Sequence, residues 1–588
     1  MRNFLCGLVI IVPALLQGGL SGTYVIGDQG GTDYSTFTEA ASALQSQGVS
    51  GPVTFNVLSG TYNEYFTLSN ISGTSATNTV TFQKYASSTG DVTLSNTTSS
   101  SSYNYIIRLN GPDYVTFKNI TFDRSGATGS YGSIIRFDTG TSYITIDSCV
   151  FKGVDTNSSS TNYSIIYSYN NSQYNGVKIK NSTFTDGGNY AISLTASSSS
   201  PPTGLEITNN TFTNTYAGIY LKYYDAVTIR GNTIKGSYML DYGIYLNYCD
   251  GANVIEDNYI YAPDMAHGIH LNYCQASSGN EATIVNNLIC VEDYGLYINT
   301  YNYYQNVYHN TVNVRDNYAL YSYYGSQYIT LKNNIFSSES NIPMYFYNSV
   351  TGLVSDYNNL YGLSSDQVYY SGNKTLAEWQ TAGFGTNSVS IYPVYETDST
   401  LVPMTVALDN LGTPLSDITD DINGTTRSTT APDMGAIEFT TSGSALSGTY
   451  TIGTSGNYTS INAARIGLLA YGISGPVTFN ILSGTYTENI HLSAVSGVSA
   501  TNPITFQSAA ANADSVIWEN SGSSSNANYA LQLRGLGHVK VKHITFKGDS
   551  SSYSRKIVLA GAVDSVTIDS SKFLGYQGGS SNNHASIF

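Results

Sequence analysis

Aromatic side chains recur at one position in five successive copies of a short phrase. The phrase reads Gly-Ile-Tyr-Leu at residues 218–221 and again at 243–246, and it returns with small changes at 268–271, 295–298 and 319–322. Its third position holds Tyr220, Tyr245, His270, Tyr297 and Tyr321. Tyrosine offers an apolar ring and a hydroxyl, which suit the faces and hydroxyls of a sugar. These residues are predicted to bind a polysaccharide; alternatively, the rings stack on one another and only protect a sheet surface.

His270 interrupts this row and is the one member that gains a proton near about pH 6.5. If the ligand is an acidic polysaccharide, binding is therefore expected to strengthen below that pH. Two positions further on, the same copies carry a parallel stripe of mostly amide side chains, Lys222, Asn247, Asn272, Asn299 and Tyr323.

Charged residues make up only 11% of the chain, so their clustering is informative. A lyase needs a base, for which Lys222, Arg230 and His270 are candidates. A hydrolase needs close carboxylates, for which Asp241, Asp257 and Asp264 are candidates. Carboxylates and further charged residues in the same copies are Asp225, Asp241, Asp250, Glu256, Asp257, Asp264 and His267. The alternative is that they are solvated turn residues. No catalytic motif or metal-ligand motif occurs, so the catalytic residues stay unassigned and no cofactor is predicted. Calcium stays open as an alternative that no motif supports.

The elements that position these residues are short strands. The phrase alternates between apolar and polar residues, so Ile219 and Leu221 point one way and Tyr220 the other. A second phrase beginning with Asn follows each copy, and the combined period of roughly 22–29 residues marks a solenoid. The recurring asparagines are expected to form a ladder at one turn: Asn210, Asn232, Asn258, Asn287, Asn310, Asn334 and Asn359.

The predicted fold is all-β, a right-handed parallel β-helix whose coils stack at about 4.8 Å. Ile219, Ile244, Ile269 and Leu296 should form one inward apolar stack. Residues 34–47 are the clearest helix, with Ser35 or Thr36 as N-cap, and are expected to cap the open end of the solenoid. A helical turn at 376–379 is expected to pack on the last coil.

The organisation is predicted to be a duplicated unit. Residues 1–20 form a signal peptide, with one early charge and a short apolar run. Residues 21–440 form a complete unit with a closing segment at 362–440, and a linker at 441–445 follows. Residues 475–486 repeat 51–62 almost letter for letter, so 447–588 are expected to be the start of a second, truncated unit of a longer protein.

Two segments support a family resemblance. Helix, strand and Ser59-Gly60-Thr61-Tyr62-Asn63-Glu64 resemble the opening of pectin-lyase-like right-handed β-helix proteins, particularly secreted β-helix repeat proteins of bacteria. Residues 421–439, with Arg427, resemble the closing signature of such units. The resemblance implies fold and secretion. Motifs of pectin methylesterases and polygalacturonases are absent from the sequence.

Composition and motifs together favour a secreted or cell-surface protein. A net charge of −16 argues against nucleic acid as a partner, and no membrane span is predicted after signal removal. The predicted function is non-catalytic binding of a polysaccharide or cell-surface glycan, or adhesion. The alternative is a polysaccharide lyase or glycoside hydrolase acting through the first unit. Cys249 and Cys274 occupy equivalent positions and are either bonded or two small buried residues.

Overall fold

The computed structural model describes residues 18–98, 100–169, 171–236, 239–441, 443–493, 495–520, 528–561, 563–575 and 582–588. Most of the predicted signal peptide lies outside these ranges. The chain folds into two compact units, and the first runs to Ser390 and includes Gly412–Glu438. The second contains Ile391–Leu411 and the chain from Phe439 onward. No helix among the described residues is long and apolar enough to cross a membrane.

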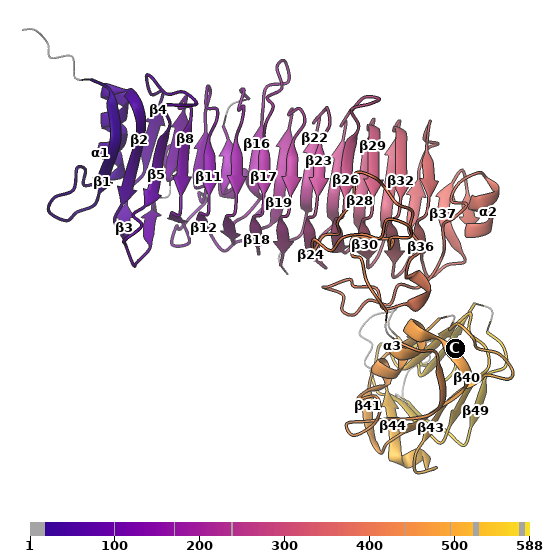
Figure 1. Ribbon diagram of the computed structural model, residues 1–588. Helices are drawn as coiled ribbons and strands as arrows, with labels where there is room; N and C mark the ends of the chain where they lie inside the picture. The colour runs from indigo at the N-terminus through magenta and orange to yellow at the C-terminus, as the bar shows by residue number, and fades with distance from the viewer. Residues whose placement is uncertain are drawn as a thin grey trace, which may run out of the picture. The chain divides into compact units, whose positions relative to one another are not determined.

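The first unit is a parallel β-helix built from three sheets, which confirms the predicted fold (Figure 1). Sheet A contains β1 (Leu20–Ile26), β2 (Val49–Val57), β5 (Val80–Lys84), β8 (Val115–Lys118), β11 (Thr145–Asp147), β14 (Lys178–Lys180), β17 (Glu206–Thr208), β20 (Thr228–Arg230), β23 (Val254–Glu256), β26 (Ala282–Val285), β29 (Tyr303–Tyr308), β32 (Gln327–Lys332) and β35 (Val354–Asp356).

Sheet B contains β3 (Gly60–Asn63), β6 (Val92–Ser95), β9 (Thr121–Asp123), β12 (Val150–Lys152), β15 (Thr183–Thr185), β18 (Thr211–Thr213), β21 (Thr233–Lys235), β24 (Tyr259–Ala262), β27 (Leu288–Val291), β30 (Thr311–Val314), β33 (Ile335–Ser338) and β36 (Asn359–Tyr361).

Sheet C contains β4 (Phe66–Ser69), β7 (Ile107–Asn110), β10 (Ile135–Phe137), β13 (Ile166–Ser168), β16 (Tyr190–Thr195), β19 (Ala217–Lys222), β22 (Tyr242–Asn247), β25 (His267–Asn272), β28 (Tyr294–Thr300), β31 (Tyr318–Tyr324), β34 (Met344–Phe346), β37 (Asp366–Tyr370) and β38 (Asn373–Thr375). Only the last pair of this sheet, β37 and β38, is antiparallel.

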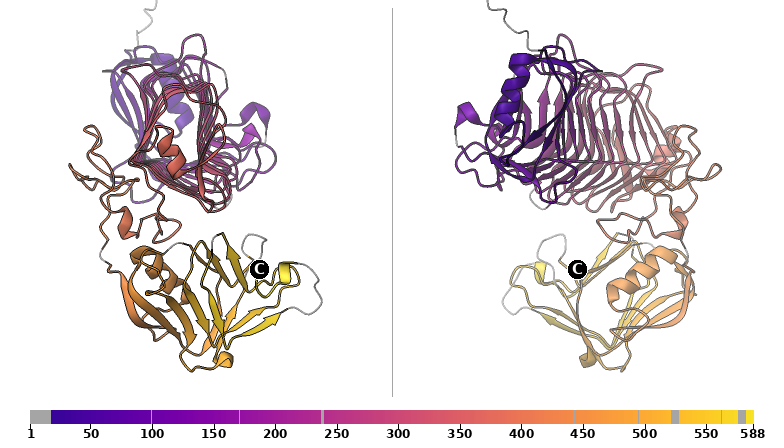
Figure 2. Two further views of the ribbon diagram at one scale, coloured as in Figure 1. Left: turned by 90° about the vertical axis from the view of Figure 1, so that its right-hand side faces the viewer. Right: turned by 60° about the vertical axis from the view of Figure 1, so that its left-hand side comes forward.

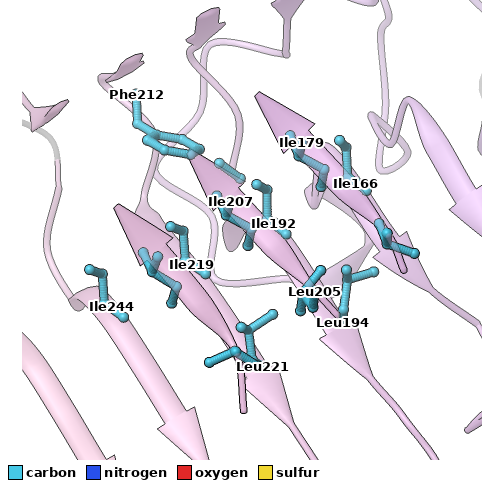
Figure 3. Packing of buried hydrophobic residues seen from close by; sticks show 14 of the residues in the cluster. Ile166, Ile179, Ile192, Leu194, Leu205, Ile207, Phe212, Ile219, Leu221 and Ile244 are labelled. Carbon is cyan, nitrogen blue, oxygen red and sulfur yellow. The ribbon is translucent and has the colours of Figure 1, made fainter. Parts of the chain in front are cut away.

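The core of the solenoid consists of identical positions stacked coil upon coil. Ile219, Ile244, Ile269 and Leu296 pair in register and are all buried, as predicted. Figure 3 shows Ile192, Ile219 and Ile244 of this stack. Because each coil covers the apolar face of the next, burial is continuous along the axis. The thiols of Cys149, Cys249, Cys274 and Cys290 are buried and form no disulfide with one another, so Cys249 and Cys274 pack as small apolar residues.

The N-terminal end of the solenoid is covered by α1 (Phe37–Gln47), which confirms the predicted cap (Figure 2). Thr36 is its N-cap, and Phe37 packs into the core. Glu64, the last residue of the Ser-Gly-Thr-Tyr-Asn-Glu motif, accepts hydrogen bonds from the amides of Phe37 and Thr38 at 3.0 Å. A carboxylate at these unpaired amides stabilises the helix start. The motif therefore joins the cap to the second coil.

The predicted asparagine ladder is present inside the turn between sheets A and B. Each Nδ2 donates to the Oδ1 of the next asparagine at 2.9–3.0 Å. The rungs are Asn210, Asn232, Asn258, Asn287, Asn310, Asn334 and Asn358. The prediction of Asn359 as the last rung is wrong, because Asn359 begins β36 and pairs with Ile335.

The C-terminal end of the solenoid carries α2 (Leu376–Thr381), with Thr375 and Glu378 forming a capping box. Trp379 is fully buried and stacks near Phe346 of the last coils, in agreement with the expected helical turn. The closing signature packs on the side of the β-helix. Arg427 is buried and donates hydrogen bonds to Asn286 Oδ1 and to the carbonyl oxygen of Gly435.

The second unit begins with the same elements as the first. Its strands and helix are β39 (Leu446–Ile452), α3 (Ile461–Tyr471), β40 (Ile473–Ile481), β41 (Gly484–Thr487), β42 (Ile490–Leu492), β43 (Ile504–Ser508), β44 (Val516–Glu519), β45 (Leu531–Arg534), β46 (Val539–Lys542), β47 (Thr545–Gly548), β48 (Ile557–Ala560), β49 (Thr567–Asp569) and β50 (Lys572–Gly575). Glu488 accepts hydrogen bonds from the amides that begin α3, as Glu64 does for α1.

The structure places residues 391–411 in a different unit from the one predicted. The sequence predicts that they belong to the closing segment of the first unit, whereas they group with the second unit. Val394 lies in the apolar core of that unit, and Tyr392 accepts a hydrogen bond from Arg465 of α3. The segment lacks the solenoid period, so its packing partner is decided by apolar contacts that no repeat pattern shows.

Candidate functional site

One row of side chains runs along the outer face of sheet C. The five predicted residues lie in it in direct register, from Tyr220 on β19 to Tyr321 on β31. The strand pairing extends the row in both directions. In order it reads Arg108, Arg136, Tyr167, Ser193, Tyr220, Tyr245, His270, Tyr297, Tyr321, Tyr345 and Tyr369. We call this set the sheet C row.

The rings in the middle of the sheet C row pack on one another. The centroids of Tyr245 and His270 are 4.4 Å apart, and those of His270 and Tyr297 are 4.5 Å apart. A second file of rings, Tyr242, His267, Tyr294 and Tyr318, interleaves with them. Neighbouring rings therefore cover much of each other's faces, and the half-buried tyrosines offer mainly edges and hydroxyls to a ligand.

His270 is buried, with 4% of its surface exposed. Its Nε2 lies 3.2 Å from Asn299 Nδ2. Burial, followed by the nearby His267, lowers the pKa of His270 to about 3. The expectation that His270 becomes cationic near about pH 6.5 is therefore wrong. The neighbouring rings take its imidazole out of water, which disfavours the charged form.

Amide side chains flank the row as predicted. Asn272 Nδ2 donates to Asn247 Oδ1 at 3.0 Å, and Asn247 Nδ2 lies 3.4 Å from the Tyr220 hydroxyl. Lys222 pairs with Asn247 in the strand register, and its ammonium group lies over the ring of Tyr223 at 4.7 Å. The stripe thus places hydrogen-bonding groups beside the ring edges.

A groove of about 660 Å³ opens on the sheet C row between Arg136 and Tyr220. Its walls include the turns η1 (Ser101–Tyr103) and η2 (Thr161–Tyr163). The lining is almost wholly hydroxyl, amide and aromatic: Ser101, Ser102, Asn104, Tyr131, Arg136, Thr161, Asn162, Ser164, Tyr167, Ser168, Tyr169, Ser193, Thr195 and Tyr220. Of these, the sequence prediction included only Tyr220. Arg136 and Tyr167 each follow an apolar residue in Ile135-Arg136-Phe137 and Ile166-Tyr167-Ser168, and this alternation is the sequence signal that could have placed them on the outer face.

Two arginines share one carboxylate at the groove. Asp138, 1% exposed, accepts from Arg136 Nε at 2.7 Å and from Arg108 Nε at 2.5 Å. The guanidinium of Arg136 lies 3.5 Å from the ring centroid of Tyr169. Burial raises the pKa of Tyr167 to about 12, so its hydroxyl stays neutral. The carboxylate and the ring hold Arg136 in one orientation.

The structure does not assemble the predicted catalytic sets. Lys222 and His270 lie on sheet C, whereas Arg230 lies on sheet A, paired with Glu256 at 2.8 Å and Asp257 at 3.5 Å. Asp257 is thereby also separated from Asp241, which begins the β22 coil at sheet C. The charged residues considered for catalysis therefore lie on two different sheets and do not form one site.

Asp241 and Asp257 are the two half-buried members of the carboxylates considered for a hydrolase, and burial raises the pKa of each to about 6. Asp241 lies beside the tyrosines of sheet C, whereas Asp257 follows β23 on sheet A. Asp264 is exposed. In the described part of the chain, no three His, Cys, Asp or Glu side chains are grouped so that they could hold a metal ion.

Comparison with known families finds the family described as periplasmic copper-binding protein (NosD). It matches residues 56–260, 129–322 and 203–391, which together extend over more than half of the 588 residues. No curated protein sequence matches the chain significantly.

Several solved structures are similar to this chain at low identity. The PL6 family alginate lyase AlyGC is 11% identical, with 95% of this chain and 81% of that chain covered and a TM-score of 0.33. XylC in complex with xylose is 10% identical, with 72% and 99% covered and a TM-score of 0.47. The GH136 lacto-N-biosidase from Eubacterium ramulus is 11% identical, with 59% and 65% covered and a TM-score of 0.36.

Proposed function

Because the chain belongs to the NosD family of parallel β-helix proteins, we propose that it works outside the cytoplasm and that its first unit binds a polysaccharide on the outer face of sheet C. The family is described as periplasmic, which supports this location. Binding without catalysis is the role proposed, since the charged side chains first considered for catalysis lie on different sheets.

The groove on the sheet C row is the observation that carries this proposal. Sugars are bound by aromatic rings together with hydroxyl and amide groups that exchange hydrogen bonds with sugar hydroxyls. Tyr167, Tyr169 and Tyr220 supply the rings, and Ser193 with Thr195 supplies hydroxyls from the floor. Along the row, successive positions are one strand spacing apart, about 4.8 Å. A glycan laid along the axis therefore meets equivalent groups in several coils.

The copper in the family's description does not fit the residues of this chain. Copper prefers imidazole and sulfur ligands arranged around one point. His267 and His270 have ring centroids 5.3 Å apart, but each ring lies between tyrosine rings. No third donor completes a group in the described residues, and Cys249 and Cys274 are buried in the core. The proposal therefore uses no metal.

The test is retention of the protein on a panel of immobilised plant, algal and bacterial polysaccharides, with product release measured in the same samples. Ser193→Trp fills the groove, and the double variant Tyr245→Ala/Tyr297→Ala removes rings further along the row. Both are expected to reduce retention at least tenfold, with larger loss from the groove variant.

A matched control removes a ring pair elsewhere. Tyr304 and Tyr328 stack at 4.5 Å on sheet A, so Tyr304→Ala/Tyr328→Ala should leave retention unchanged. Retention that is unchanged in both sheet C variants would overturn the proposal. Release of shortened or unsaturated products by the wild type would replace binding with catalysis.

A further inference from the structure

The groove on the sheet C row is locally cationic, although the whole chain has a net charge of −16. Among the described residues that line it, Arg136 alone is charged. Arg108 is its neighbour in register on one side. On the other side, Lys222 pairs in register with Thr195, which also lines the groove.

Asp138 neutralises only part of this charge. Its two oxygens accept from Arg108 Nε, Arg136 Nε and Arg136 Nη2. Each guanidinium carries five N–H donors, so most donors of Arg108 remain outside this carboxylate. One carboxylate against two guanidinium groups leaves one positive charge. Lys222 is not among the lining residues but places a further cation beyond the Thr195 side of the groove, with its ammonium group over the ring of Tyr223. A cleft with a single sign of charge concentrates ligands of the opposite sign even on a protein of like net charge.

Arg136 is held where a sugar in the groove would present a substituent. Arg136 and Tyr167 are adjacent rungs, so a sugar ring over Tyr167 and Ser193 has its edge within one strand spacing of Arg136. Asp138 and Tyr169 fix the guanidinium from two sides, which lowers the entropy lost when it binds. The Nε and Nη2 edge of Arg136 is already bonded to both oxygens of Asp138, so a ligand carboxylate would pair with the Nη1 and Nη2 edge, which also allows two parallel hydrogen bonds.

From this placement we infer that the groove selects polysaccharides bearing carboxylate groups, with Arg136 as the principal carboxylate ligand and Lys222 as a second cation. This inference rests on the proposed polysaccharide binding and names its ligand class. Neutral parts of the same glycan lie along the tyrosines and amides of the sheet C row.

The experiment compares polymers that differ only in charge. The full chain is titrated with polygalacturonate and with alginate, each beside its fully esterified form, and with dextran sulfate. We expect binding of at least one carboxylated polymer, weakened about tenfold or more by esterification, and weakened by added salt because screening reduces the attraction. Dextran sulfate should bind more weakly than the preferred carboxylate polymer.

Variants connect the preference to the named residues. Arg136→Gln and Lys222→Gln should each weaken carboxylate-polymer binding about tenfold and weaken binding of the esterified form much less. Arg136→Lys should recover only part of the loss, since a lysine lacks the fork. Arg230→Gln, which removes an arginine paired on sheet A, is the control and should change nothing. If Arg136→Gln unfolds the protein because the buried Asp138 loses a partner, Lys222→Gln still tests the inference in a folded protein.

The outcomes separate this inference from the proposed function. Equal binding of charged and esterified polymers, with loss in Ser193→Trp, would overturn carboxylate selection and leave polysaccharide binding standing. A preference for dextran sulfate over both carboxylated polymers would also overturn it. Absence of binding to every polymer in the panel would overturn both.

Discussion

Removal of one rung from the asparagine ladder should destabilise the solenoid strongly and locally. The side chain of Asn258 makes four hydrogen bonds: it accepts from the amide and Nδ2 of Asn232 and donates to Ile229 O and Asn287 Oδ1, at 2.9–3.1 Å. Asn258 is fully buried, so water cannot replace these partners. At about 1 kcal/mol per hydrogen bond, Asn258→Ala should lower the free energy of unfolding by about 4 kcal/mol.

A second substitution separates hydrogen bonding from volume. Asn258→Asp keeps the shape, but its second oxygen faces Ile229 O and Asn287 Oδ1, which donate nothing. It should be at least as destabilising as alanine, because it adds a buried charge without a partner. Asn306→Ala, on the outer face of β29, is the matched control and should cost less than about 0.5 kcal/mol.

Urea unfolding followed by circular dichroism measures the loss, and hydrogen exchange locates it. Because each coil contacts only its neighbours, protection should fall first in the coils that hold Asn232 and Asn287. The reasoning is refuted if Asn258→Ala unfolds at the urea concentration of Asn306→Ala, or if the aspartate is well tolerated. The ladder would then be a consequence of the register and contribute little to it.

Three further predictions concern pH, capping and the division into units. Burial lowers the pKa of His270 to about 3 from about 6.5 in the unfolded chain, so the unfolded state binds an extra proton between these values and stability falls as pH drops below about 6.5. His270→Tyr should reduce that slope by up to about 1.4 kcal/mol per pH unit, which urea titrations at several pH values measure; an unchanged slope would contradict the buried neutral imidazole. Glu64→Ala should cost about 1 kcal/mol or more by uncapping α1, read by the urea midpoint, whereas Glu206→Ala, an exposed partner of Lys178, should cost almost nothing. Limited proteolysis should cut first at residues 441–445, and first cleavage inside 215–335 would count against this boundary.

Local sequence patterns were sufficient to predict the architecture because every coil of a solenoid repeats the same short pattern. Alternation within each phrase decides which side chains face inward, and the period decides which phrases stack. The cap also follows from nearby residues: Thr36 precedes the apolar face of α1. These predictions needed no knowledge of distant contacts.

The last rung of the ladder shows where local patterns stop. Asn358 and Asn359 are adjacent, and both fit the phrase. Only the register of β36 on β33 directs Asn358 into the turn and Asn359 into the strand.

Exposure of the sheet C row was likewise decided by tertiary packing. Alternation correctly directs His270 outward, but the rings of Tyr242, Tyr245 and Tyr297 close around it and leave it buried and neutral. How much of an outward side chain meets water depends on the size and tilt of its neighbours in other coils, which no single phrase contains.

The groove could not be read from the chain in order. Its floor comes from coils whose phrases differ from Gly-Ile-Tyr-Leu, and its walls come from turns near residues 101–104 and 161–164. Stacking brings Arg136, Tyr167 and Ser193 to adjacent rungs although they are separated along the sequence. The sequence alone determines that such rows exist. Strand register and loop placement decide which residues meet in them. The reason is that coil lengths vary, and only backbone pairing aligns one coil on the next.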